Sequence, residues 1–292
     1  MSMKSRSSFR WPVLLGVAVS CLLCLALQGS AWEFLHRHNA RFVSENHYHI
    51  TLSRLQNASL LAGNTVFLGS SITERLISTD EIAVIGVPGS SFLGGMQFVP
   101  YESFPRGTVF VLEANNVFSG VVQGVIEDTD KWTFRAFRGS RHFSIAAKPS
   151  SLLLSLVYFW KDPRRSLSTD RGVLPGNPAE PCLPAVSPLE GEAARQAERR
   201  YRSLLDGMAE LRSRGYRLCL AFVPERNASH HEKDLARMQE LAALADVPLL
   251  DYTGSEAARQ LEWTDDRHLN SKALSTARLR NTIARDARQW AR

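Results

Sequence analysis

The strongest constraint on the fold is a repeated alternation of short apolar segments with helix-forming segments. Stretches with helical spacing of apolar residues separate the apolar segments, and the longest of them, Glu190–Gly215, ends at a glycine. Continuous apolar strands separated by helices are typical of a parallel sheet covered by helices on both faces. The sequence therefore predicts a doubly wound α/β fold with about five parallel strands. The predicted strands are Thr65–Gly69, Ile82–Val87, Gly107–Asn115, Tyr216–Pro224 and Val247–Thr253.

The N-terminus carries a second strong signal. Lys4, Arg6 and Arg10 precede the uncharged segment Trp11–Leu27, whose roughly 17 residues are near the minimum for a membrane span and just longer than a usual signal-peptide core. A small-residue sequence ending at Ala31 could serve as a cleavage site. Residues 1–31 are therefore predicted to be a membrane anchor or a cleaved signal peptide. In both cases the positive flank places the rest of the chain outside the cytoplasm, either anchored to the cytoplasmic membrane or secreted.

The remaining chain is divided by composition. Residues 32–63 have loosely helical spacing and are predicted to form a stalk helix, and residues 64–292 form the main domain with an insertion at 118–188. The apolar segment Ser150–Trp160 within this insertion is too short to span a bilayer. It is consistent with a helix packed on the core or with a membrane-facing or substrate-covering lid.

Composition disfavours several classes of partner and cofactor. The net charge is +6, but the basic residues are spread along the chain, so a nucleic-acid partner is not favoured. No phosphate-binding loop or dinucleotide fingerprint is present, and no CxxC or Cys/His zinc pattern occurs outside the apolar N-terminal segment, so we predict neither cofactor nor metal. Cys182 and Cys219 could form a disulfide in an oxidising compartment, although Cys219 lies in an apolar strand where a buried free thiol is equally ordinary. Four histidines of the stalk segment need no metal to explain them: His36, His38, His47 and His49.

Polar residues gather where the predicted strands end. The carboxyl ends of parallel strands meet at one edge of a sheet, where ligands bind. A serine at such a strand–helix turn can cap the helix, or it can act as a nucleophile if a base takes its proton. The four polar stretches are Gly69–Ser71, Gly86–Ser91, Glu113–Asn116 and Thr264–Asn270.

Together these stretches contain the groups that acyl transfer requires. Ser71 is the predicted nucleophile, His268 the base, and Asp265 the carboxylate that orients the imidazole. The backbone N–H groups of Ser71 and Gly89 and the side-chain amide of Asn115 could stabilise an oxyanion. A glycine at position 89 would let the backbone approach the substrate closely. Ser70 is predicted to shape the turn.

The same stretches resemble the four blocks of the SGNH (GDSL-like) hydrolase superfamily. "FLGSSIT", "IGVPGSS", "VLEANN" and "DDRHLN" are similar to the blocks that supply Ser, Gly, Asn and His. Ser70 stands where aspartate is usual, and Glu113 stands where glycine is usual. The resemblance covers Thr65–Asn116 and Pro248–Arg292 and implies a flavodoxin-like sheet. It also implies catalytic roles for Ser71, Asp265 and His268, and an oxyanion hole of Ser71, Gly89 and Asn115.

The resemblance also implies a function. The Gly-Ser-Ser form with an N-terminal anchor is similar to that of members that act in cell-envelope acylation, such as the D-alanyl transfer protein of teichoic acids and the periplasmic alginate O-acetylation proteins. It implies O-acyl transfer to or from a polysaccharide through an acyl-serine, alongside a multispanning membrane acyltransferase. Two alternatives remain open: a secreted lipase or simple esterase, and a non-catalytic protein that binds polysaccharide or assembles a membrane complex.

Overall fold

A computed structural model gives the structure of the chain in two compact units. The first combines residues 1–56 with 140–169, and the second combines residues 57–139 with 170–292. Within them the structure describes residues 10–37, 55, 58, 61, 63–115, 117, 134, 149–161, 192–226, 231–263, 268–271 and 273–291.

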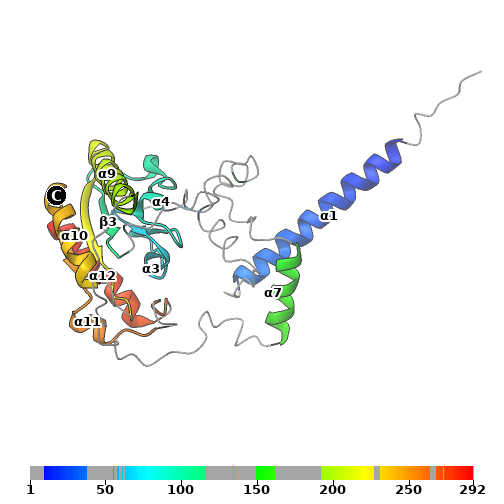
Figure 1. The fold of residues 1–292 in the computed structure, drawn as a ribbon. Coiled ribbons are helices and arrows are strands. Elements are labelled where there is room, and N and C mark those ends of the chain that lie inside the picture. Colours follow the sequence, from blue (N-terminus) through cyan, green and yellow to red (C-terminus); the bar gives the residue numbers. More distant parts are fainter. Residues whose placement is uncertain are drawn as a thin grey trace, which may run out of the picture. The chain divides into compact units, whose positions relative to one another are not determined.

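The second unit is built on a five-stranded sheet in which every strand pairing is parallel (Figure 1). The strand order is β2-β1-β3-β4-β5, which is the order of flavodoxin-like doubly wound sheets. Each strand falls inside a segment that the sequence predicts to be extended, so the prediction of an α/β fold with about five parallel strands is confirmed. The strands are β1 (Thr65–Gly69), β2 (Ile82–Gly86), β3 (Val109–Glu113), β4 (Arg217–Phe222) and β5 (Leu249–Asp251).

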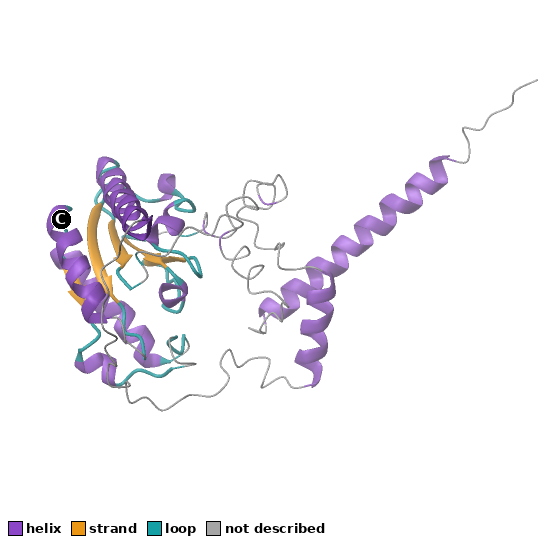
Figure 2. Ribbon diagram, in the orientation of Figure 1, coloured by secondary structure: helices purple, strands orange, loops and turns teal. Residues whose placement is uncertain are grey.

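Helices cover both faces of the sheet (Figure 2). One face carries Phe67, Val111 and Cys219, which share a buried cluster with apolar residues of α12 (Leu274–Trp290). On the other face, Gly95 of α4 (Phe92–Met96) lies against Leu68. The long helix α9 (Glu192–Ser213) packs on α4, and α10 (His231–Leu244) packs on β5. Because both faces are covered, the central residues of β1, β3 and β4 are apolar and buried, and the charged residues Glu113 and Arg217 stand only at strand ends.

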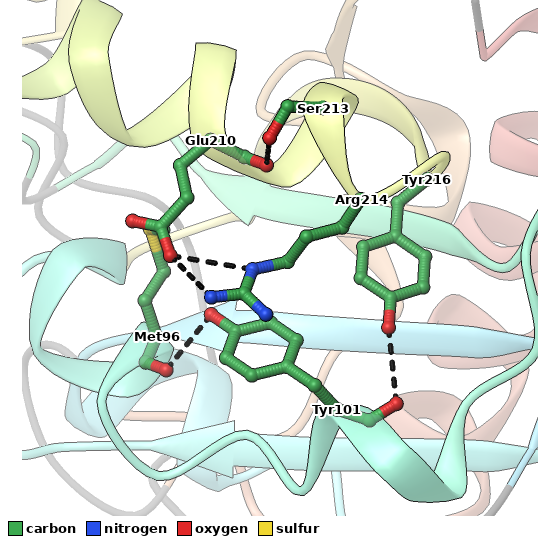
Figure 3. Close-up of polar contacts among 6 residues, drawn as sticks. All are labelled: Met96, Tyr101, Glu210, Ser213, Arg214 and Tyr216. Atoms are coloured by element: carbon green, nitrogen blue, oxygen red, sulfur yellow. Dashed lines mark hydrogen bonds and ion pairs between the residues drawn. The ribbon is translucent and has the colours of Figure 1, made fainter.

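A polar cluster fastens the sheet at the amino ends of its strands (Figure 3). The Tyr216 hydroxyl donates to the carbonyl of Tyr101 at 3.1 Å, and the Tyr101 hydroxyl donates to the carbonyl of Met96 at 3.0 Å. The guanidinium of Arg214 lies 4.0 Å from the centre of the Tyr101 ring and pairs with Glu210 at 2.7 Å. Burial raises the pKa of Tyr101 to about 12. Since Tyr216 directly precedes β4, this cluster lies at the edge opposite to the strands' carboxyl ends and serves stability.

The first unit contains the long helix α1 (Arg10–Arg37) and helix α7 (Pro149–Lys161), which pack on one another. Residues Trp11–Ala31 of α1 are long and apolar enough to span a membrane, which confirms the predicted apolar membrane or signal helix. The helix continues without a break past residue 31 to Arg37. Most of the predicted stalk beyond Arg37 lies outside the described residues. So does the predicted insertion 118–188, apart from residue 134 and α7.

The cysteine of the sheet is a free thiol. Cys219 lies in β4 with none of its surface exposed, and burial raises its pKa to about 12. Cys182, its candidate disulfide partner, lies outside the described residues.

Candidate active site

The two adjacent serines after β1 have different roles in the structure. Ser70 is the N-cap of the short helix α3 (Ser71–Glu74), and its Oγ accepts a hydrogen bond from the backbone N–H of Ile72 at 3.2 Å. Ser71 is the first residue of α3, and its Oγ lies 2.9 Å from Nε2 of His268. The cap role therefore falls to Ser70, and the Ser71 hydroxyl is within hydrogen-bond reach of an imidazole.

His268 is held by buried neighbours at the C-terminal end of a short loop. Trp263 and Leu269 form an antiparallel bridge, and both are almost fully buried. The backbone N–H of Asn270 donates to the carbonyl of Glu262 at 2.8 Å, which joins the residues that flank this bridge. His268, next to Leu269 in the chain, is therefore held at a buried base. Asp265, the predicted orienting carboxylate, lies in the part of this loop outside the described residues.

A buried carboxylate organises the turn that carries Ser71. The side chain of Glu113, at the end of β3, is 2 % exposed and accepts four hydrogen bonds from the neighbouring turn. Two come from Ser70, whose N–H and Oγ donate at 2.8 Å and 2.6 Å, and two from Thr73, whose N–H and Oγ1 donate at 3.0 Å and 2.6 Å. Both carboxylate oxygens act as acceptors, so the interaction fixes the residues on either side of Ser71.

Glycines make room for this arrangement. A Cβ at Gly69 would overlap the Glu113 carboxylate and the Thr73 hydroxyl. A Cβ at Gly86, the last residue of β2, would lie 2.6 Å from the carbonyl oxygen of Ser70. Any larger residue at either position would displace the turn or the carboxylate that holds it.

The sequence predicts no role for Glu113, which stands where glycine is usual in the SGNH blocks that the chain resembles. A signal was present, because a carboxylate ends a strand that is otherwise entirely apolar, and such a group needs partners if it is buried. The partners are not local, since Ser70 and Thr73 lie 43 and 40 residues earlier in the chain.

The segment that follows α3 is held by a side chain of α12. The Arg280 guanidinium is largely buried and donates to the carbonyls of Leu76 at 3.3 Å and Ile77 at 3.0 Å, and burial lowers its pKa. Ile77 has a φ of 50°, a left-handed conformation that is strained for a β-branched residue. The segment after Ser71 is thus held in a strained backbone conformation by a buried cation.

Two backbone groups of the predicted oxyanion hole lie on adjacent strand ends. The N–H groups of Ser70, Ile72 and Thr73 are all engaged in hydrogen bonds, whereas that of Ser71 has no acceptor among the described residues. Gly89 has a φ of 75° and lies three residues past the end of β2. This loop adjoins the turn that carries Ser71, because the N–H of Val87 donates to the carbonyl of Gly69 at 2.8 Å.

Asn115 has a structural role in this conformation. Its side-chain amide donates to the carbonyl of Val223 at 2.7 Å and to a carboxylate oxygen of Glu225 at 2.8 Å, and its amide oxygen accepts from the N–H of Val223 at 2.9 Å. These contacts join the ends of β3 and β4. Both hydrogens of the amide are engaged, and the contact with Glu225 is the one that a substrate oxygen would have to replace.

Within the described residues, no group of three or more His, Cys, Asp or Glu side chains is arranged to hold a metal ion. No family model, curated protein or solved structure matches the chain. The geometry of the site itself brings Ser71 and His268 together at the edge of the sheet where ligands of such folds bind.

Proposed function

We propose that the chain is a membrane-anchored serine enzyme that transfers or removes O-acyl groups, such as acetyl, on a polysaccharide outside the cytoplasm. The observation that supports it most directly is the 2.9 Å separation of Ser71 Oγ and His268 Nε2. These residues are 197 positions apart in the chain, and each is anchored by buried neighbours. A serine and a histidine held at hydrogen-bond distance are the minimum that nucleophilic acyl chemistry requires.

The proposed reaction has two halves. In the first, Ser71 Oγ attacks the carbonyl carbon of an ester as its proton passes to His268 Nε2, and the imidazolium then gives this proton to the departing alcohol. The N–H groups of Ser71 and Gly89 stabilise the oxyanion, joined by Asn115 once it releases Glu225. In the second half, a sugar hydroxyl or water attacks the acyl-serine as its proton passes to His268 Nε2; the bond between the acyl carbon and Ser71 Oγ then breaks, and the imidazolium returns the proton to Ser71 Oγ. Asp265 is proposed to hold the imidazole in the required tautomer.

The proposed location of the second unit outside the cytoplasm and the proposed polysaccharide acceptor have different support. Lys4, Arg6 and Arg10 precede the span of α1, which favours a cytoplasmic N-terminus and an external second unit. The choice of an envelope or secreted polysaccharide, and of a multispanning membrane acyltransferase as partner, rests on the resemblance to membrane-anchored SGNH members.

The test uses the full-length chain in detergent with a fluorophosphonate probe and a chromogenic acetyl ester. We expect the probe to label Ser71 and the ester to be hydrolysed. Ser71→Ala should abolish labelling, and His268→Ala should slow it by about 10²–10⁴-fold, the usual contribution of a general base. Ser203→Ala, at an exposed position of α9, is the matched control and should change neither. A folded protein without label or turnover would contradict the proposal and favour a non-catalytic binding role.

The same assay separates the two fates of the acyl-serine. If a sugar hydroxyl is the natural acceptor, adding an oligosaccharide should raise ester turnover and yield an acylated sugar. Turnover that is unchanged by any added sugar would identify a hydrolase.

A further inference from the structure

The apolar helix α1 defines a membrane region in the first unit. Residues Trp11–Ala31 are 21 residues without a charged side chain, and large apolar side chains are exposed from Trp11 to Leu27. At 1.5 Å per residue this segment is about 32 Å long, close to the thickness of the hydrocarbon core of a bilayer. A helix that is apolar on all sides and unburied has a surface suited to lipid.

Helix α7 packs on the C-terminal part of α1 (Figure 1). The rings of Phe34 and Phe159 meet edge to face with their centres 5.4 Å apart. Leu152, at the start of α7, is 3 % exposed. The insertion therefore contributes a second apolar helix to the unit that contains the candidate span.

An open groove of about 1240 Å³ lies between the two helices. The α1 wall is formed by residues between Cys24 and Phe34, where Gln28 and Ser30 are the polar side chains, and the α7 wall is entirely apolar. On α7, Leu153, Val157 and Trp160 are 64 %, 42 % and 88 % exposed. Their spacing of four and three residues places them in one stripe along the helix.

The composition of α7 suits the part of a membrane leaflet next to the lipid headgroups. No charged residue occurs from Pro149 to Trp160, and Lys161 then ends the helix. The 13 residues are about 20 Å long, too short to cross a bilayer. A tryptophan followed by a lysine is typical of the boundary between hydrocarbon and headgroups, where the ring and the cation both find suitable surroundings.

We infer that α7 lies in the outer leaflet beside α1 and that phospholipid acyl chains fill the groove between them. The outer leaflet follows from the topology, because the groove adjoins the end of α1 that is farthest from the positively charged N-terminus. Acyl chains suit the groove better than a partner helix does. Packed transmembrane helices approach through small residues, whereas this groove is wide and presents the bulky side chains of Leu153, Val157 and Trp160. Its volume also exceeds the roughly 300–1,000 Å³ of a pocket for one small molecule.

The groove between α1 and α7 depends on the residues around the candidate cleavage site at Ala31. Ala31 and the residues around it are helical and line the groove, so signal cleavage there would remove one wall. We therefore expect the chain to keep residues 1–31 as a membrane anchor.

The experiment locates side chains relative to lipid and does not depend on enzymatic activity. The full-length chain, with Cys21→Ala, Cys24→Ala and Cys182→Ser, is reconstituted in vesicles of phosphatidylcholine and phosphatidylglycerol. A nitroxide label is attached at Leu153→Cys, and collisions with oxygen and with a water-soluble nickel complex are measured. Leu274→Cys is the matched control, because Leu274 is 65 % exposed on α12 of the second unit against 64 % for Leu153. Leu14→Cys in α1 gives the lipid reference, and Val157→Cys repeats the measurement at a second position of α7.

We expect the oxygen-to-nickel ratio at positions 153 and 157 to match that at 14 and to exceed that at 274 severalfold. A ratio at 153 and 157 equal to that at 274 would show a stripe in water and would overturn the inference. Protection of both labels from oxygen and nickel would show that protein covers the groove, and would overturn it too. An intact mass that lacks residues 1–31 would do the same.

Discussion

The double substitution Ser70→Asp with Glu113→Gly moves the carboxylate from position 113 to position 70. We expect it to restore most of the stability that either single substitution removes. Glu113→Gly alone leaves the N–H groups of Ser70 and Thr73 buried without acceptors. Each such group costs about 1–3 kcal/mol, so with the cavity we expect a loss of about 4 kcal/mol. That is a large share of the 5–15 kcal/mol by which domains are usually stable.

Ser70→Asp alone is also costly, because it places a second carboxylate where the Ser70 hydroxyl now donates to Glu113 at 2.6 Å. Two charges about 3 Å apart at an effective dielectric constant near 20 repel by roughly 5 kcal/mol. In the double variant the aspartate has no such neighbour. As an N-cap it can accept from the N–H groups of Ile72 and Thr73, which leaves one orphaned N–H and a net loss of about 1–2 kcal/mol.

The free energy of unfolding can be measured by urea titration of the full-length protein in detergent micelles, with the buried Trp263 as fluorescent probe. We expect a coupling energy of at least about 3 kcal/mol, at the upper end for residues in contact. Glu113→Gln is the matched control and should cost about 1.5–3 kcal/mol, the usual value of a hydrogen bond to a charged group. If the double variant instead costs the sum of the two single substitutions, to within about 0.5 kcal/mol, the claim that one carboxylate serves both positions is refuted.

Three further predictions concern single residues. Ile77→Asn should raise the free energy of unfolding by about 1 kcal/mol, because asparagine tolerates the left-handed φ of 50° better than a β-branched residue, and a lower urea midpoint would contradict the assigned strain. Cys219 should resist iodoacetamide in the native protein and react in urea without reductant, as peptide mapping would show; resistance in urea would instead indicate a disulfide. Stability should fall as the pH rises from about 10, where tyrosine ionises in the unfolded chain, to about 12, where Tyr101 ionises in the folded one. Tyr101→Phe should make this decline shallower, and an unchanged pH profile of the unfolding midpoint would count against the raised pKa.

The fold could be predicted from the sequence because of the way parallel sheets are buried. A strand covered on both faces is apolar along its middle, so β1, β3 and β4 stand out as short, nearly continuous apolar segments. The pairing of Ser71 with His268 could also be predicted, since strand ends far apart in sequence meet at one edge of such a sheet. The predictions that succeeded depend on burial and topology, which leave a local trace in the sequence.

The environment of α7 and the tether of Asn115 could not be predicted, for two different reasons. Apolarity shows that Ser150–Trp160 avoids water, but it does not distinguish a protein core from another apolar helix or from lipid. The contact of Asn115 with Glu225 spans 110 residues and involves side chains that are ordinary in loops. Neither residue type carries a signal that it will meet the other.

The positions of Ser70 and Glu113 in the structure explain why both differ from the motif that the sequence resembles. A motif specifies residue types along the chain, whereas the turn that carries Ser71 requires one carboxylate within reach of the N–H of Thr73 and the cap position of α3. Asp at the cap position or Glu at the end of β3 can meet that requirement, since β1 and β3 are adjacent parallel strands. Taken one at a time, Ser70 and Glu113 each weaken the resemblance. The two residues are in contact, because the Ser70 hydroxyl donates to the Glu113 carboxylate at 2.6 Å, so the turn has a carboxylate beside it although position 70 is a serine.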